Sequence, residues 1–181
     1  KNKNLKLFTI NNINILSHSF NGETQILKIK HNNKIHNIKL NLIGKIQIKN
    51  LLMAIIAANQ KDTYAEGSVG WFYQNGYGVE KDYEKALEYL RRAKNAGSAY
   101  AMNLLANHYV EGWGVQKDYS KAISYYTKSA NKNDDYAQGQ LGYFYYYGEG
   151  VEENKKLAYY WFKKSAEQGN TYSESWLGHL Y

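Results

Sequence analysis

The chain contains no cysteine among its 181 residues. A disulfide framework, a thiolate nucleophile and a zinc site with cysteine ligands are therefore excluded, and either redox compartment would suit the fold. Long apolar runs are also lacking, because the longest, residues 51–58, falls well short of the roughly 20 residues that span a bilayer. Residues 1–14 lack the uninterrupted apolar region of a signal peptide. We expect a cytoplasmic protein, or a periplasmic or secreted one if a targeting segment lies outside this piece.

Tyrosine and tryptophan are missing from residues 1–61, although the chain holds 19 Tyr and 4 Trp. This first segment also has a single acid, Glu23, against 10 Lys, which gives it a net charge of +9. Residues 62–181 carry 13 Lys or Arg and 15 acids, a net charge of −2, so the two parts add up to the +7 of the chain. We interpret the change at residue 61 as a boundary between two segments of different origin.

The second segment repeats one pattern at a spacing of 36 residues. Each copy has two glycines separated by one residue and followed by valine, at 76–79, 112–115 and 148–151. Alanines and tyrosines on both sides keep the same register: Ala86, Ala122 and Ala158, and Tyr73, Tyr109, Tyr145 and Tyr181. Such a period is typical of a stacked solenoid. We predict copies at 62–98, 99–134 and 135–170 and a partial copy at 171–181, so the chain is expected to be a piece of a longer or processed product.

The apolar residues within a copy follow a helical period and predict two antiparallel helices. Asp82, Asp118 and Asn154 stand where the second helix begins, and each side chain can cap a free backbone N–H group there. Left-handed backbone is expected in the turns, and a close helix approach is expected at small residues. The left-handed positions are Gly78, Gly114 and Gly150 between the helices and Gly97, Asn133 and Gly169 after the second helix; the small positions are Gly70, Ala106, Gly142 and Gly178.

These residues resemble the Sel-one-like repeat family, which is related to the tetratricopeptide repeats. The third copy supplies the family's fixed positions: Ala137, Leu141, Gly142, Tyr145, Gly148, Gly150, Val151, Tyr159, Tyr160, Trp161, Ala166 and Gly169. The resemblance covers residues 62–181 and implies a mainly α fold, a helix-pair solenoid with a tetratricopeptide-like right-handed superhelix. It also implies a non-enzymatic scaffold or adaptor that binds a protein or peptide.

One stripe of the first helices differs between copies, whereas the core-facing positions are filled alike. The stripe residues are Trp71 and Gln74 in the first copy, Asn103, Asn107 and Val110 in the second, and Tyr143 and Tyr146 in the third. Because packing does not dictate variable positions, we expect this stripe to contact a ligand. A tetratricopeptide-like superhelix would place it on the concave face. The alternative is that the tyrosines are amphipathic filler at half-buried positions.

Catalytic and metal-binding residues are not expected. His108 occupies the core-facing position of Phe72 and Phe144, which predicts a buried imidazole with one nitrogen hydrogen-bonded. His179 falls on the variable stripe, but no second ligand accompanies it at metal-binding spacing. We therefore expect no catalytic residue, no metal and no cofactor.

The first segment alternates apolar and polar residues at 5–10, 25–29 and 35–42, which predicts strands of a small sheet, and the run 50–59 predicts a helix. Residues 5–60 resemble an internal piece of the Mur ligases, the family of the UDP-N-acetylmuramyl-tripeptide synthetase, and the matching motif is the stretch 42–54. The resemblance implies that Gln47 and Asn50 would lie beside an ATP adenine, although glutamine departs from the family's asparagine. Since the chain has no phosphate-binding glycine loop, we expect an inactive or incomplete ligase fragment without ATPase activity.

The charge of the first segment and the partial C-terminal copy each bear on a further class of partner, nucleic acid in the first case and a second copy of the chain in the other. Ten lysines without paired aromatic residues favour a solvated surface over nucleic-acid recognition, which we do not expect. The partial fourth copy predicts uncovered apolar area at Leu177, Leu180 and Tyr181. Terminal solenoid units need a polar cap, so we expect self-association through this last helix.

Overall fold

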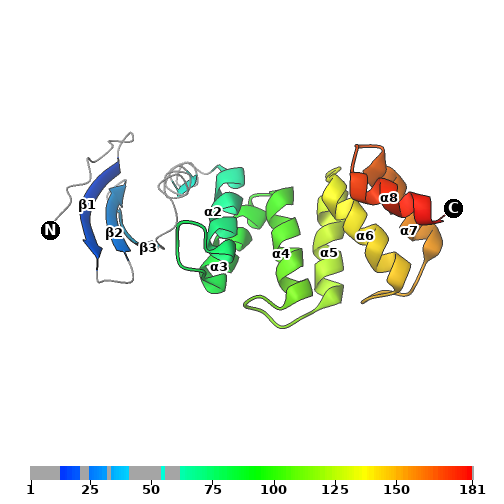
Figure 1. Ribbon diagram of the computed structural model, residues 1–181, viewed down its shortest axis with the longest axis horizontal. Helices are drawn as coiled ribbons and strands as arrows, with labels where there is room; N and C mark the ends of the chain where they lie inside the picture. Colours follow the sequence, from blue (N-terminus) through cyan, green and yellow to red (C-terminus); the bar gives the residue numbers. More distant parts are fainter. Residues whose placement is uncertain (1–12, 21–24, 32–33, 41–53, 56–61, 181) are drawn as a thin grey trace.

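The computed structural model describes residues 13–20, 25–31, 34–40, 54–55 and 62–180. The N-terminal part is an antiparallel sheet of three strands, β1 (Ile13–Phe20), β2 (Gln25–His31) and β3 (Lys34–Leu40), in the order β1-β2-β3. Ile15 pairs with Ile29 and Ser17 with Lys28, so the register shifts between Ile15 and Ser17. Figure 1 places this sheet at the N-terminal end of the molecule's long axis.

The strand boundaries differ from the sequence-based ones. The predicted strands at 25–29 and 35–42 overlap β2 and β3, whereas β1 was not predicted and the expected strand at 5–10 lies outside the described residues. Of the helix predicted at 50–59, only Ala54 and Ile55 are described, and both are helical. Gln47 and Asn50 also lie outside the described residues.

Residues 62–180 form seven helices, and successive helix pairs follow one another along the long axis (Figure 1). Their bounds are α2 (Thr63–Asn75), α3 (Tyr83–Asn95), α4 (Ala99–Glu111), α5 (Tyr119–Ala130), α6 (Asp135–Tyr147), α7 (Lys155–Ala166) and α8 (Thr171–Leu180). The first helices of the units, α2, α4, α6 and α8, begin 36 residues apart, and so do the second helices, α3, α5 and α7. The predicted helix-pair solenoid is therefore confirmed.

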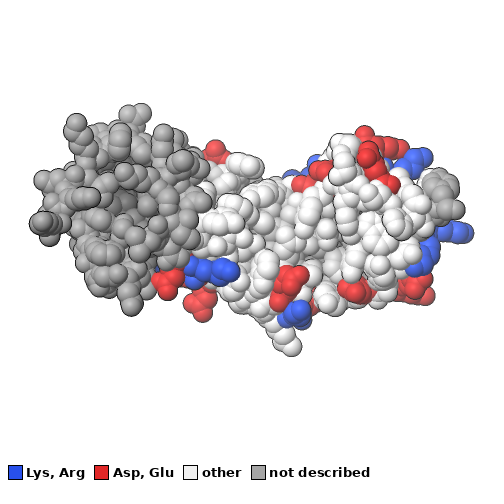
Figure 2. Space-filling model, in the orientation of Figure 1, with Lys and Arg blue, Asp and Glu red and all other residues white. Residues whose placement is uncertain are grey.

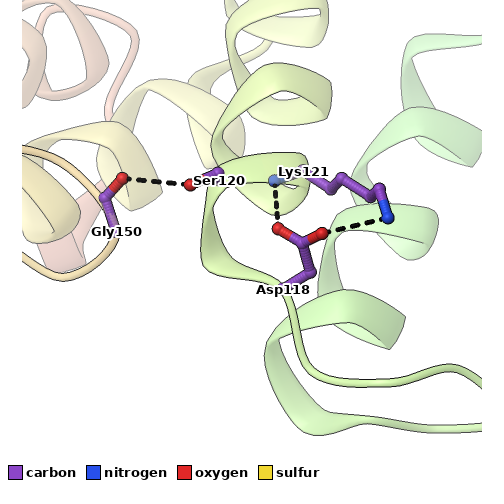
Figure 3. A network of polar contacts seen from close by, with 4 residues as sticks. All are labelled: Asp118, Ser120, Lys121 and Gly150. Atoms are coloured by element: carbon purple, nitrogen blue, oxygen red, sulfur yellow. Dashed lines mark hydrogen bonds and ion pairs between the residues drawn. The ribbon is translucent and has the colours of Figure 1, made fainter.

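Capping side chains fix where the second helices begin. Asp82, Asp118 and Asn154 are their N-cap residues, as predicted, and each side chain accepts a hydrogen bond from the backbone N–H three residues later. Asp118 also forms an ion pair with Lys121 at 3.0 Å. Figure 3 shows this cap beside the hydrogen bond from the Ser120 hydroxyl to the Gly150 carbonyl of the next unit. This hydrogen bond links the start of α5 to the loop between α6 (Asp135–Tyr147) and α7 (Lys155–Ala166) of the next unit.

The loop glycines have the left-handed backbone that their recurrence predicted. Gly114 and Gly150 have φ values of 68° and 72°. A Cβ atom on Gly114 would lie 2.8 Å from the Cβ of Tyr83, and one on Gly150 would lie 2.5 Å from the Cβ of Tyr119. Because Tyr83 and Tyr119 belong to the preceding unit's second helix, these glycines let each loop pack closely against its neighbour.

Buried residues join each unit to the next. One cluster connects α3 with α4 through residues that include Leu87, Leu90 and Leu105. A second cluster connects α4, α5 and α6: Ala106, Ala122, Ile123, Tyr126, Ala130, Ala137, Leu141 and Phe144. These clusters join the first unit to the second and the second to the third, as expected where each unit buries its apolar face against a neighbour. Within the described ranges, no helix has both the length and the apolar character needed to cross a membrane.

Candidate protein-binding surface

The variable stripe lies on the first helices, which approach one another along the array. The helix α2 contacts α4, and α6 contacts α8. In the face that Figure 2 presents, charged side chains gather toward the edges of the helical part, and its middle is mostly uncharged. The chemistry of the stripe itself changes from the first unit to the last.

The two asparagine side chains of the stripe form hydrogen bonds inside the protein. The Nδ2 of Asn103 donates to the N-cap carboxylate of Asp134 at 2.8 Å, and Asn103 is buried. The Oδ1 of Asn107 accepts hydrogen bonds from the hydroxyls of Tyr126 and Tyr136, at 2.5 and 3.1 Å. These amides therefore hold helices together, and Asn107 is the one that remains half-buried at the surface.

Two predicted contact residues are corrected by their burial. Gln74 is 7% exposed and Asn103 is 5% exposed, so neither presents its side chain to a partner. The position of Asn103 is taken by Gly67 and Gly139 in the neighbouring units. A Cβ atom on Gly139 would lie 2.8 Å from the Ser173 hydroxyl of the next first helix. The glycine at this position of the third unit therefore leaves room for Ser173.

The third unit and α8 form an aromatic cluster, which we define as Tyr143, Tyr146, Tyr147 and Trp176. The ring centroids of the three tyrosines lie 6.2, 5.0 and 5.8 Å from that of Trp176. Tyr147 is 50% exposed, and the other three are half-buried. Behind them, Phe162 of α7 stacks on Trp176 at 5.4 Å with an interplanar angle of 5°. Four accessible rings on one rigid support are suited to bind a partner.

Trp176 and Tyr147 were not among the predicted contact residues. Position 176 corresponds to Ser68, Leu104 and Gln140 in the earlier units, so the variation that selected the stripe is also present here. Applying the criterion of variation between copies to position 176 and its counterparts would have identified Trp176. Tyr147 is the last residue of α6 and was overlooked because it adjoins the recurrent glycine loop.

The remaining stripe residues are less accessible. Trp71 is half-buried and contacts the rings of Phe72 and Tyr77, with centroid distances of 5.6 and 5.1 Å. Val110 is half-buried and packs against the core cluster of α4, α5 and α6. These two residues lie on the first helices outside the aromatic cluster, and both are half-buried.

A lysine lies against the aromatic cluster. The Nζ of Lys155 is 3.4 Å from the centroid of the Tyr146 ring, donates to the Tyr146 carbonyl at 2.7 Å and pairs with Glu153 at 3.2 Å. Burial raises the pKa of the Tyr143 phenol, and the nearby Glu149 carboxylate raises it further. The Tyr143 phenol therefore stays protonated beside a carboxylate, and the neighbouring Tyr146 ring lies against an ammonium group.

The two histidines of the helical part have different surroundings. His108 is fully buried, its Nδ1 lies 2.6 Å from the Trp113 carbonyl oxygen, and its Nε2 has no hydrogen-bond partner among the residues that the structure describes. The predicted buried imidazole with one bonded nitrogen is confirmed, and burial lowers its pKa. His179 is exposed, with its Nδ1 2.7 Å from the Ser175 carbonyl oxygen. The described part of the chain brings together no group of three His, Cys, Asp or Glu residues that could hold a metal ion.

The repeats match the model of one known family, Sel1 repeat, over residues 64–98, 99–134 and 135–170. The structure is similar to a Sel1 repeat protein from Oxalobacter formigenes, with 35% identity and a TM-score of 0.70 over 74% of this chain and 55% of that one. It is also similar to c5321, a protective antigen of uropathogenic Escherichia coli strains that displays an SLR fold, with 31% identity and a TM-score of 0.67.

A third similar structure is the cysteine rich protein B of Helicobacter pylori, with 26% identity and a TM-score of 0.58 over 74% of this chain and 96% of that one. The present chain shares its fold without any cysteine. It spans only 29% of the c5321 chain, and 74% of this chain takes part in that match. No match was found among curated proteins.

Proposed function

The chain belongs to the Sel1 repeat family, whose members are generally protein-interaction scaffolds, and we propose that it binds a protein or peptide along its first helices. In this proposal the first helices line the concave face of a right-handed superhelix. The contact residues are Trp71, Asn107, Val110 and the aromatic cluster. The family is typically non-enzymatic, and we propose the same for this chain, without a cofactor.

The observation that carries the proposal is the accessible aromatic cluster on α6 and α8. Tyrosine and tryptophan dominate binding hot spots because they bury a large area while losing little side-chain freedom. Trp176 is held from behind by Phe162, so its orientation is set before any partner arrives. A rigid aromatic anchor of this kind reduces the entropy that binding costs.

A peptide-display selection against the whole chain tests the proposal. We expect enriched peptides whose affinity falls about 10- to 30-fold in the double variant Tyr143→Asn, Tyr146→Val, as for a hot spot of about 2 kcal/mol. These substitutions install the second unit's own residues, Asn107 and Val110, so the helix tolerates them.

Tyr160→Ser is the matched control. Tyr160 is 46% exposed on the second helix α7, and its counterpart in the second unit is Ser124. The control should bind the selected peptides as the parent does. The proposal fails if no peptide is enriched over an unrelated protein, or if the double variant and the control bind alike.

A further inference from the structure

The contact between Lys155 and Tyr146 shows what the aromatic cluster can hold. The Lys155 ammonium nitrogen is 3.4 Å from the ring centroid, whereas the other lysine and arginine contacts with rings in the described helices are 5.1–5.8 Å. Aromatic ring faces attract cations through their quadrupole. One face of the cluster is therefore already occupied by a cation of the protein itself.

Other rings of the cluster remain accessible beside that lysine. The planes of Tyr143 and Tyr147 make angles of 83° and 89° with that of Trp176. In the corner between two rings at right angles, a cation meets the electron-rich faces of both rings. Because half of Tyr147 is exposed, a second cation can reach this corner from solvent.

Two carboxylates lie at or just after the C-terminal ends of the first helices α4 and α6. Glu149 follows the end of α6 and acts electrostatically on Tyr143, and Glu111 ends α4 and acts on Tyr126, which hydrogen-bonds to Asn107. Neither glutamate forms an ion pair with a residue that the structure describes. Residues 134–181 carry seven acids and four lysines, so the field at this end is negative.

We propose that the partner is a protein that presents an extended segment with lysine or arginine side chains, one of which enters the aromatic cluster beside Glu149. The inference rests on the proposed function and specifies its partner. A purely apolar partner would cover Glu149 without supplying a countercharge, which is unfavourable. A cationic partner can contact the ring faces and also supply a countercharge to the carboxylates.

Synthetic peptides test the choice of cation. The probe is a fluorescein-labelled glycine–serine peptide with evenly spaced lysines, and the matched peptide has glutamine in place of every lysine. Each is titrated with the whole chain by fluorescence anisotropy at low and at physiological salt. We expect the lysine peptide to bind about 10-fold more tightly than the glutamine peptide.

Variants separate a specific site from general attraction. Glu111→Gln with Glu149→Gln should weaken the lysine peptide about 5-fold. Trp176→Leu, which copies Leu104 of the second unit, should also weaken it. Glu167→Gln removes an exposed carboxylate at the end of α7 and should have no effect. Equal weakening by Glu167→Gln would reveal general charge attraction and overturn the inference.

Two further outcomes would contradict the inference without touching the proposed function. Equal affinity for the lysine and glutamine peptides would show that the site does not select a cation, even if displayed peptides still bind. The other occupant to exclude is a second copy of this chain, through its own residues 1–61, whose net charge is +9. A mass that rises with concentration in light scattering and falls when the lysine peptide is added would identify that occupant instead.

Discussion

The second unit (residues 99–134) and the third unit (residues 135–170) share one backbone but present different surfaces. Their helices start 36 residues apart and are capped in the same way. On the first helix, however, Asn107 and Val110 of the second unit become Tyr143 and Tyr146 in the third. The repeat geometry is therefore compatible with either a polar or an aromatic face.

Core residues underneath explain why the two faces differ. In the second unit the Tyr126 hydroxyl reaches Asn107 and holds its side chain. The third unit has Phe162 in that position, which has no hydroxyl and stacks on Trp176 instead. Gly142 makes room for it, because a Cβ atom there would lie 2.6 Å from the Phe162 ring. A change of one core residue thus accompanies a change from an internally bonded surface to an aromatic one.

The largest effect is expected where the two units are alike, at the loop glycines. Gly114→Val and Gly150→Val should each lower the free energy of unfolding by about 2 to 5 kcal/mol, because left-handed strain adds to overpacking. The new side chain would collide with Tyr83 in the first case and Tyr119 in the second. Thermal unfolding followed by circular dichroism measures both. A melting curve like the parent's for either variant would show that its loop can relax away from the preceding unit.

A smaller effect concerns how the free energy of unfolding depends on pH, in which the second unit should differ from the third. His108 fills the position that Phe144 has in the third unit, and burial lowers its pKa from 6.5. Since the unfolded chain then binds the proton more readily, this histidine's contribution to stability is present above about pH 6.5 and is lost as the pH falls. The loss is at most about 1.4 kcal/mol per pH unit.

The variant His108→Phe should remove that part of the pH dependence. The charged group that acts on the imidazole is Arg91, which also disfavours its protonation, and the rings of Tyr83 and Trp113 enclose it. Urea unfolding of parent and variant from about pH 7.5 to about pH 5.5 gives the difference, in which the contributions of the other histidines cancel. Parallel stability curves would mean that the buried imidazole accepts its second proton without penalty.

The repeats were predictable from sequence because their determinants are local. Helix caps and left-handed glycines act within a few residues of their own position, as at Asp82, Asp118 and Asn154. Because the same pattern recurs every 36 residues, it can be recognised by comparing the copies. The same reasoning failed at Gln74 and Asn103, since burial depends on a neighbouring helix.

The candidate site was only partly predictable for the same reason. Tyr143 and Tyr146 were found by their variation between copies, but Trp176 joins them from a helix about 30 residues further along. The bonds from Tyr126 and Tyr136 to Asn107 likewise connect three helices. A single sequence does not indicate which variable residue contacts which neighbouring helix. The aromatic cluster could therefore be identified only from the structure.

The smallest effect concerns the turn after the second helix, where the residue with left-handed backbone is asparagine in the second unit and glycine in the third. Asn133 has a φ of 65° and is the one non-glycine residue with positive φ in the described part of the chain, whereas the third unit has Gly169 at 85°. Asn133→Ala should lower the free energy of unfolding by about 1 kcal/mol, since alanine lacks asparagine's tolerance of this conformation. Asn133→Gly should stay within about 0.5 kcal/mol of the parent, because glycine adopts the left-handed backbone more readily and this offsets the lost hydrogen bond to Gln168.

The converse variant Gly169→Asn has room for its side chain, with no described atom within 4 Å of the added Cβ. Urea unfolding of all three variants would contradict this account if Gly169→Asn lost as much stability as Asn133→Ala, because asparagine would then be a poor substitute for glycine at this turn.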